Sequence, residues 1–225
     1  MKEPTSRQLY AYWNDIRGDR LAPRRFEVEP SRIAALLPDT FILESIDAAT
    51  ARFRLAGTRI CEAFVNEFRG LNVFELFGPE DRVALKRTFA PIAGQGAVGL
   101  IAIEGRTETG KLAGFEMLVV PLIHTEDTID RYLGSMTPVS PPAWLGHEPI
   151  VSIRLVSSEL IWPEGRPKAV ADAMKRQSLF MPHIRNARIV KSDRRQFRVY
   201  DGGLGKNSDD QAVFEALISK DELPL

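Results

Sequence analysis

The order of secondary-structure signals between residues 39 and 77 most constrains the fold of this chain. A short apolar run at 40–44 and an alternation of apolar residues with arginines at 51–56 predict two β-strands joined by a hairpin turn. A helical segment at 58–64 follows, and a glycine at position 70 ends the next turn. Two strands followed at once by short helices predict a small sheet that is covered on one face by helices.

The next 60 residues complete this predicted sheet. A proline followed by two acidic residues opens a helix over 79–93. Three strand-like runs then occur at 98–107, 111–122 and 131–138, separated by a turn and a polar loop. Strands joined in this way form an antiparallel meander beside the first two strands. The predicted fold class is therefore α+β, with a five-stranded antiparallel sheet and short helices on one face.

A flanking helix is predicted at the N-terminus, over residues 5–17. One face of it carries four apolar residues at helical spacing, namely Leu9, Tyr12, Trp13 and Ile16. We expect this face to form the interface of a homodimer. The alternative is that the stripe packs on its own domain, which is the commoner fate of such a helix face.

Charge balance and cysteine content exclude several function classes. The chain has 30 basic and 30 acidic residues, so no net field attracts nucleic acid or a membrane surface. Its single cysteine, Cys61, excludes an internal disulfide framework and a cysteine-rich metal site. The N-terminus lacks a signal-peptide run, and no window reaches the roughly 20 apolar residues of a membrane helix. We expect a cytoplasmic protein without a membrane partner.

The composition changes after residue 138. Residues 138–145 are proline-rich, which is typical of a linker, and residues 149–160 form either one more strand or an extended arm. Residues 164–206 hold eleven basic and four acidic residues. This basic segment is either a solvated extension or a docking arm for a protein or an anionic signal, and it carries no recognisable nucleic-acid motif.

These changes divide the chain into three predicted parts. Residues 1–38 are a helical flank that ends in a short helix at 31–37. Residues 39–138 are the sheet domain. Residues 139–225 are a proline-rich linker with a basic extension, which is partly disordered or docked on the core.

Short motifs along the chain resemble the PAS domain family. The residues at 53–64 and 68–77 are similar to the family's second strand, a helix ending in an aromatic residue, a glycine turn and a short apolar helix. More narrowly, about residues 9–138 resemble short bacterial PAS-like proteins without an attached kinase or cyclase. The residues that carry this resemblance are Tyr12, Trp13, Arg17, Pro23, Pro30, Leu36, Leu37, Pro38, Phe41–Glu44, Arg54, Gly57 and Thr58.

The resemblance implies a sheet that curls around a pocket closed by the helices. The apolar pocket candidates are Phe64, Phe68, Val73, Phe74, Phe77, Phe89, Ile101, Ile103, Phe115, Met117 and Met136. For each of them, filling of the core is the simpler interpretation. Arg54 and Arg59 flank the implied pocket entrance. They either hold an anionic ligand or form surface ion pairs.

Cofactor motifs of this fold are only partly matched, and no cofactor or metal is predicted. In the segment that resembles the flavin photosensor motif, Val73 replaces the reactive cysteine, which argues against a flavin–thiol adduct. No histidine lies within 79–93, which argues against a His-ligated haem, and the three histidines lack metal-ligand spacing. Residues 94–99 match G-x-G-x-x-G, but they end a helix and open a strand, so we interpret them as a loop.

The predicted function is that of a PAS-type sensory or adaptor protein in bacterial signal transduction. It binds a small ligand or a partner protein and transmits through its flanking helices. The alternative is a pure protein–protein interaction module with a filled core and no ligand. No catalytic residues are predicted, and carboxylates such as Glu104 and Glu116 are expected to face solvent, so we do not expect an enzyme.

Overall fold

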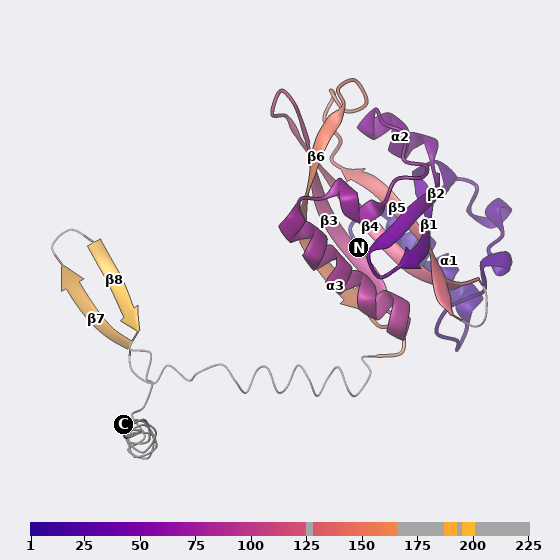
Figure 1. The fold of residues 1–225 in the computed structure, drawn as a ribbon, viewed down its shortest axis with the longest axis horizontal. Helices are drawn as coiled ribbons and strands as arrows, with labels where there is room; N and C mark the ends of the chain where they lie inside the picture. The colour runs from indigo at the N-terminus through magenta and orange to yellow at the C-terminus, as the bar shows by residue number, and fades with distance from the viewer. Residues whose placement is uncertain (125–127, 166–186, 193–194, 201–225) are drawn as a thin grey trace, which may run out of the picture. The chain divides into compact units, whose positions relative to one another are not determined.

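The computed structural model describes residues 1–124, 128–165, 187–192 and 195–200. Figure 1 shows the helices and strands. The helices are α1 (Pro4–Arg17), α2 (Thr58–Phe64) and α3 (Pro79–Gln95), and the 3₁₀ turns are η1 (Arg25–Glu27), η2 (Pro30–Ile33), η3 (Leu37–Asp39) and η4 (Val73–Leu76). The strands are β1 (Thr40–Asp47), β2 (Thr50–Ala56), β3 (Val98–Thr107), β4 (Leu112–Ile123), β5 (Ile129–Val139), β6 (Ile150–Ile161), β7 (Ala187–Ser192) and β8 (Arg195–Tyr200).

The first six strands form one antiparallel sheet in the order β2-β1-β5-β4-β3-β6. This confirms the predicted α+β class and the five predicted strands. The sheet has a sixth strand, β6, in the segment 149–160 that was expected to form either one more strand or an extended arm. It pairs with the outer edge of β3, from Val98 opposite Ile161 to Thr107 opposite Ile150. The free backbone groups of β3 provide this partner. Seven of the twelve β6 side chains are exposed, and these include the apolar Val151 and Val156, so the sequence does not alternate strictly between buried apolar and exposed polar residues.

The chain divides into two compact units, at residues 1–166 and 167–225. The first unit includes the N-terminal flank and β6 together with the sheet, so these parts pack with the predicted 39–138 domain. In the second unit the structure describes the antiparallel pair β7–β8. The expected disorder or docking of the basic extension falls mostly outside the described residues.

Two hydrophobic clusters lie on opposite faces of the sheet. On the inner face, α2, η4 and α3 cover a cluster that is rich in phenylalanine. On the outer face, α1 packs on β4 and β5. The middle of β4 is buried on both faces, so its sequence is almost continuously apolar instead of strictly alternating.

The predicted dimer-interface residues lie inside the chain's own core, which corrects the prediction for this face. Leu9 and Trp13 have no exposed surface, and Tyr12 is buried. The indole Nε1 of Trp13 donates to the carbonyl oxygen of Pro121 at 2.8 Å, and Ile16 is half-buried against the same cluster. The outer face of β4 and β5 is apolar and must be covered, and α1 covers it. Homodimer formation itself remains a prediction, without this interface.

Two smaller expectations also change. The helix predicted at 31–37 is replaced by the 3₁₀ turns η2 and η3, because the N–H groups of Leu36, Leu37 and Asp39 donate to carbonyls three residues earlier in the chain instead of four. Glu116, expected to face solvent, is only 6% exposed. Within the described residues, no helix is both long and apolar enough to cross a membrane.

Candidate functional site

All eleven apolar pocket candidates belong to the inner cluster and are buried. Their aromatic rings pack directly on one another. The Phe64 ring lies 4.6 Å from that of Phe115 and 5.1 Å from that of Phe68, and the Phe53 ring lies 5.2 Å from Phe68 (centroid distances). These distances are typical of aromatic pairs in a packed core. The centre of the predicted pocket is therefore occupied by protein side chains.

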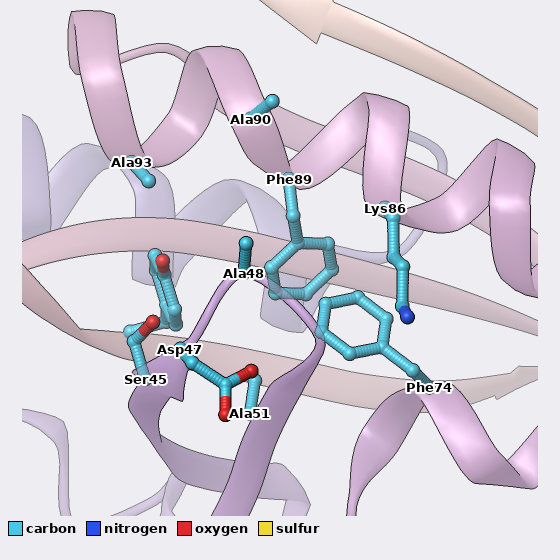
Figure 2. A pocket seen from close by; sticks show the side chains of 10 residues that line it. Ser45, Asp47, Ala48, Ala51, Phe74, Lys86, Phe89, Ala90 and Ala93 are labelled. Atoms are coloured by element: carbon cyan, nitrogen blue, oxygen red, sulfur yellow. The ribbon is translucent and has the colours of Figure 1, made fainter.

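A small cavity remains at the edge of this core, between α3 and the β1–β2 hairpin. Its volume is about 140 Å³. Figure 2 shows its lining, which consists of Ser45, Asp47, Ala48, Ala51, Phe74, Lys86, Phe89, Ala90, Ala93 and Tyr132. Of the predicted pocket residues, only Phe74 and Phe89 line it. A space of this volume admits a molecule about the size of benzene.

Local sequence explains why this space exists. On α3, Lys86, Phe89 and Ala93 follow one another at helical spacing and point toward the hairpin (Figure 2). The hairpin turn is held by the Asp47 carboxylate, whose Oδ1 accepts the backbone N–H of Ala49 at 2.6 Å. Four of the lining residues are alanines, so neither side fills the gap between helix and hairpin.

The floor of the cavity is aromatic. The rings of Phe74 and Phe89 lie 5.1 Å apart in an edge-to-face arrangement, and the rings of Phe89 and Tyr132 lie 5.3 Å apart. The Nζ of Lys86 lies 5.5 Å from the centroid of the Phe74 ring, within cation–π range. Figure 2 shows Asp47 on the hairpin and Lys86 on the helix, so the cavity combines an apolar floor with an acid and a base.

Tyr132 adds a neutral hydroxyl to this lining. Burial raises the pKa of the Tyr132 hydroxyl above its ordinary value of 10, and the negative charge of Asp130 raises it further, while a hydrogen bond with Ser45 lowers it. The hydroxyl thus keeps its proton at neutral pH. The lining supplies hydrogen-bonding and charged groups around an apolar floor, which is an arrangement for binding.

The structure separates the two arginines that were predicted to flank the pocket. Arg59 forms an ion pair with Asp39, with Nη1 2.7 Å from Oδ2. Arg54 forms one with Glu44, with Nε 3.1 Å from Oε2. Neither arginine lines the cavity beneath α3. Their surface ion pairs correspond to the alternative interpretation, although Arg54 also lines a different cleft, beside β2.

Sequence reasoning missed the polar lining residues Ser45, Asp47, Lys86 and Tyr132. Their positions in a turn, on a helix and on a strand give no shared signal, because they converge only when β1, β5 and α3 pack together. The spacing of Lys86, Ala90 and Ala93 along α3 was the one local hint of a helix face with little side-chain volume. In the described residues, no group of three or more His, Cys, Asp or Glu side chains is arranged to hold a metal ion.

The PAS domain family matches residues 1–137, which is more than half of the chain. The chain therefore belongs to the PAS domain family. Members of this family are generally sensory or signalling modules and are typically not catalysts. No match is found among curated proteins.

Two solved structures are similar to part of the chain. One is a light-oxygen-voltage domain studied with a flavin analogue. It is 17% identical, with a TM-score of 0.40, over 49% of this chain and 83% of that chain. The other is the PAS domain of an HTR-like protein from Haloarcula marismortui. It is 19% identical, with a TM-score of 0.32, over 51% of this chain and 95% of that chain.

Proposed function

We propose that this chain is a cytoplasmic bacterial sensory or adaptor protein in which a small molecule occupies the cavity between α3 and the β1–β2 hairpin. Membership of the PAS domain family over residues 1–137 supports the sensory class. The observation that carries the ligand site is the cavity itself, with the Phe74 and Phe89 rings as its floor and Lys86 and Asp47 in its lining.

The lining restricts the chemistry of the ligand. A volume of about 140 Å³ admits only a compact molecule, well below the usual range for cofactor pockets. Its body must be apolar to lie on the aromatic floor. Because Asp47 and Lys86 carry opposite charges, the best match is a small molecule with a polar or zwitterionic end.

Tyr132 offers a route from this cavity to the flanking helix. Its side chain lines the cavity on the inner face of β5, whereas the next residue, Leu133, is buried in the outer cluster beneath α1. A ligand that displaces the Tyr132 ring moves the β5 backbone and changes the contact between Leu133 and α1. Such a shift requires only that the ligand binds one arrangement more tightly than the other.

Native mass spectrometry and a thermal-shift screen of amino acids and small aromatic acids test the proposal. The variant Ala93→Phe fills the cavity from α3, and Ala35→Phe is the matched control, because Ala35 is exposed outside the cavity. With the wild type and with Ala35→Phe, we expect either a co-purified ligand in the mass spectrum or a compound that raises the melting temperature. With Ala93→Phe, we expect neither effect. A ligand that still binds to Ala93→Phe lies elsewhere.

A second candidate function is supported by the ring packing of Phe64, Phe68 and Phe115. A core that is already filled fits a protein–protein interaction module without a ligand. This second function is favoured if the mass spectrum shows only the ligand-free protein and no screened compound raises its melting temperature. A homodimer and a protein signalling partner are part of both proposals. Sedimentation equilibrium measures the homodimer, and affinity capture from the native host with the Ala35→Phe control tests for the protein partner.

A further inference from the structure

A second, cationic recess lies beside β2, apart from the cavity under α3. It consists of two adjoining clefts that share Arg52 and Gly70. The first has a volume of about 240 Å³ and is lined by Arg52, Phe53, Arg54, Arg69 and Gly70. The second has a volume of about 340 Å³ and is lined by Thr50, Arg52, Gly70, Leu71, Asn72, Glu75 and Leu76. We call the first of these the arginine cleft.

The backbone places three arginines around the arginine cleft. Arg52 and Arg54 alternate with buried residues on β2 and are both exposed, so they point away from the inner core on the same side of the strand. Arg69 comes from the loop after α2. That loop is fixed to β2 because the N–H of Gly70 donates to the Phe53 carbonyl at 2.8 Å and the N–H of Phe53 donates to the Leu71 carbonyl at 2.9 Å.

Gly70 keeps the cleft open between these arginines. Its φ of +86° lies in the left-handed region that favours glycine. A β-carbon at this position would meet no heavy atom within 4 Å and would project into open space. The absence of a side chain therefore leaves room beside Arg52 and Arg69.

The charges of the arginine cleft are not balanced within the described part of the chain. Arg54 shares the Glu44 carboxylate with Arg131, whose Nη2 lies 2.7 Å from Oε1 of Glu44. By contrast, Arg52 and Arg69 have no ion pair with any carboxylate among the described residues. Glu75 lines the neighbouring cleft, where Asn72 Nδ2 donates to its Oε1 at 3.4 Å. Like charges held together in this way repel one another until an anion binds.

We propose that the arginine cleft binds the phosphate group of a small soluble molecule. Guanidinium groups match phosphate oxygens with paired, charge-assisted hydrogen bonds, and three arginines are among the residues that line a recess large enough for a phosphate. The adjoining cleft leaves space for the rest of the molecule. This inference does not depend on the proposed ligand of the cavity beneath α3, which has a separate lining.

The test is a titration of the full chain with inorganic phosphate, followed by amide NMR, with sodium chloride adjusted to keep the ionic strength constant. We expect saturable shifts for the residues at 52–54 and 69–72. The double variant Arg52→Gln, Arg69→Gln should weaken binding by about tenfold or more, because two charge-assisted contacts are lost. The matched control is Arg87→Gln, Arg106→Gln, which removes two exposed arginines outside the cleft and should leave the affinity unchanged.

Three outcomes overturn the proposal. The first is that the shifts in phosphate equal those in chloride. The second is that the control double variant loses as much affinity as the cleft variant. The third is that the protein sediments with phosphatidic acid vesicles through Arg52 and Arg69 but does not bind phosphate in solution, which would assign the cleft to a lipid headgroup. Thermal melts of both double variants show whether they remain folded.

Discussion

The carboxylate of Glu116, in the middle of β4, accepts the backbone N–H of Lys2 at 2.7 Å. It also accepts the N–H of Glu3 at 3.1 Å. These two residues immediately precede α1, so a buried acid on the sheet ties down the start of the flanking helix. Burial raises the pKa of the Glu116 carboxyl, but the hydrogen bonds from Lys2, Ser6 and Glu3 outweigh this effect, and the pKa lies below its ordinary value of 4.5.

Replacement of Glu116 by Gln should destabilise the protein at pH 7 by about 1–3 kcal/mol, because the charged acceptor for two part-buried N–H groups is lost. Since the folded pKa is below the unfolded one, this stabilisation is present above about pH 4.5 and disappears as the pH falls through the folded pKa. Urea unfolding at several pH values measures the difference. Glu104→Gln is the control, because Glu104 pairs with the exposed Arg154. If Glu116→Gln and Glu104→Gln lose the same free energy of unfolding at every pH, Glu116 does not stabilise the start of α1 in this way.

Trp13→Ala should lower the free energy of unfolding by about 3–5 kcal/mol, because the side chain has no exposed surface and its removal leaves a cavity beneath α1. Trp13→Phe should cost less, since it loses mainly the hydrogen bond to Pro121. Denaturant melts give the stability, and light scattering gives the mass. If the wild type is a dimer and Trp13→Ala is a monomer of unchanged stability, the α1 face forms the dimer interface after all.

The Tyr132 hydroxyl should titrate above the ordinary tyrosine value of 10, because burial and the charge of Asp130 raise its pKa. An ultraviolet pH titration of the folded protein should contain this late component, and Tyr132→Phe should remove it. Ser45→Ala should move the component to still higher pH, since the hydrogen bond with Ser45 lowers the pKa. A component that survives in Tyr132→Phe belongs to another tyrosine.

Cys61 should react slowly with iodoacetamide at pH 7. Burial raises the pKa of its thiol, and the charge of Glu67 and its hydrogen bond with the thiol raise it further, so little thiolate is present. Glu67→Gln should increase the alkylation rate by a few-fold, in line with a partial loss of the pKa shift. Glu62→Gln makes the same charge change on the exposed side of α2 and should leave the rate as it is. Mass spectrometry follows the reaction.

Elements that depend on local signals agree with the sequence-based predictions most closely. The strand at 98–107 and the start of the helix at Pro79 were predicted to the residue, because both depend on local signals such as turn residues and helix-start chemistry. The sequence of β6 fits either a strand or an extended arm, because seven of its twelve side chains are exposed and apolar and polar residues do not alternate strictly along it. Its pairing depends on the free edge of β3, more than 40 residues earlier in the chain.

The apolar stripe of α1 shows the same limit. Its spacing correctly predicts a helix with a buried face, but spacing alone does not say whether that face covers a second copy or its own sheet. Only the packed sheet shows that Leu118 and Leu133 need this cover. The opposite charges of Asp47 and Lys86 come together for the same reason, across elements that are distant in sequence.

The amino-acid sequence by itself determined the order of helices and strands from β1 to β5, the antiparallel meander and the apolar identity of the inner face, because periodicity and turn chemistry act over a few residues. Tertiary structure alone decided where α1 packs, that the phenylalanines fill the centre, and where the alanines and Gly70 leave space. Cavities and charge clusters arise from side chains that meet across the fold, so they have no local signature in the chain.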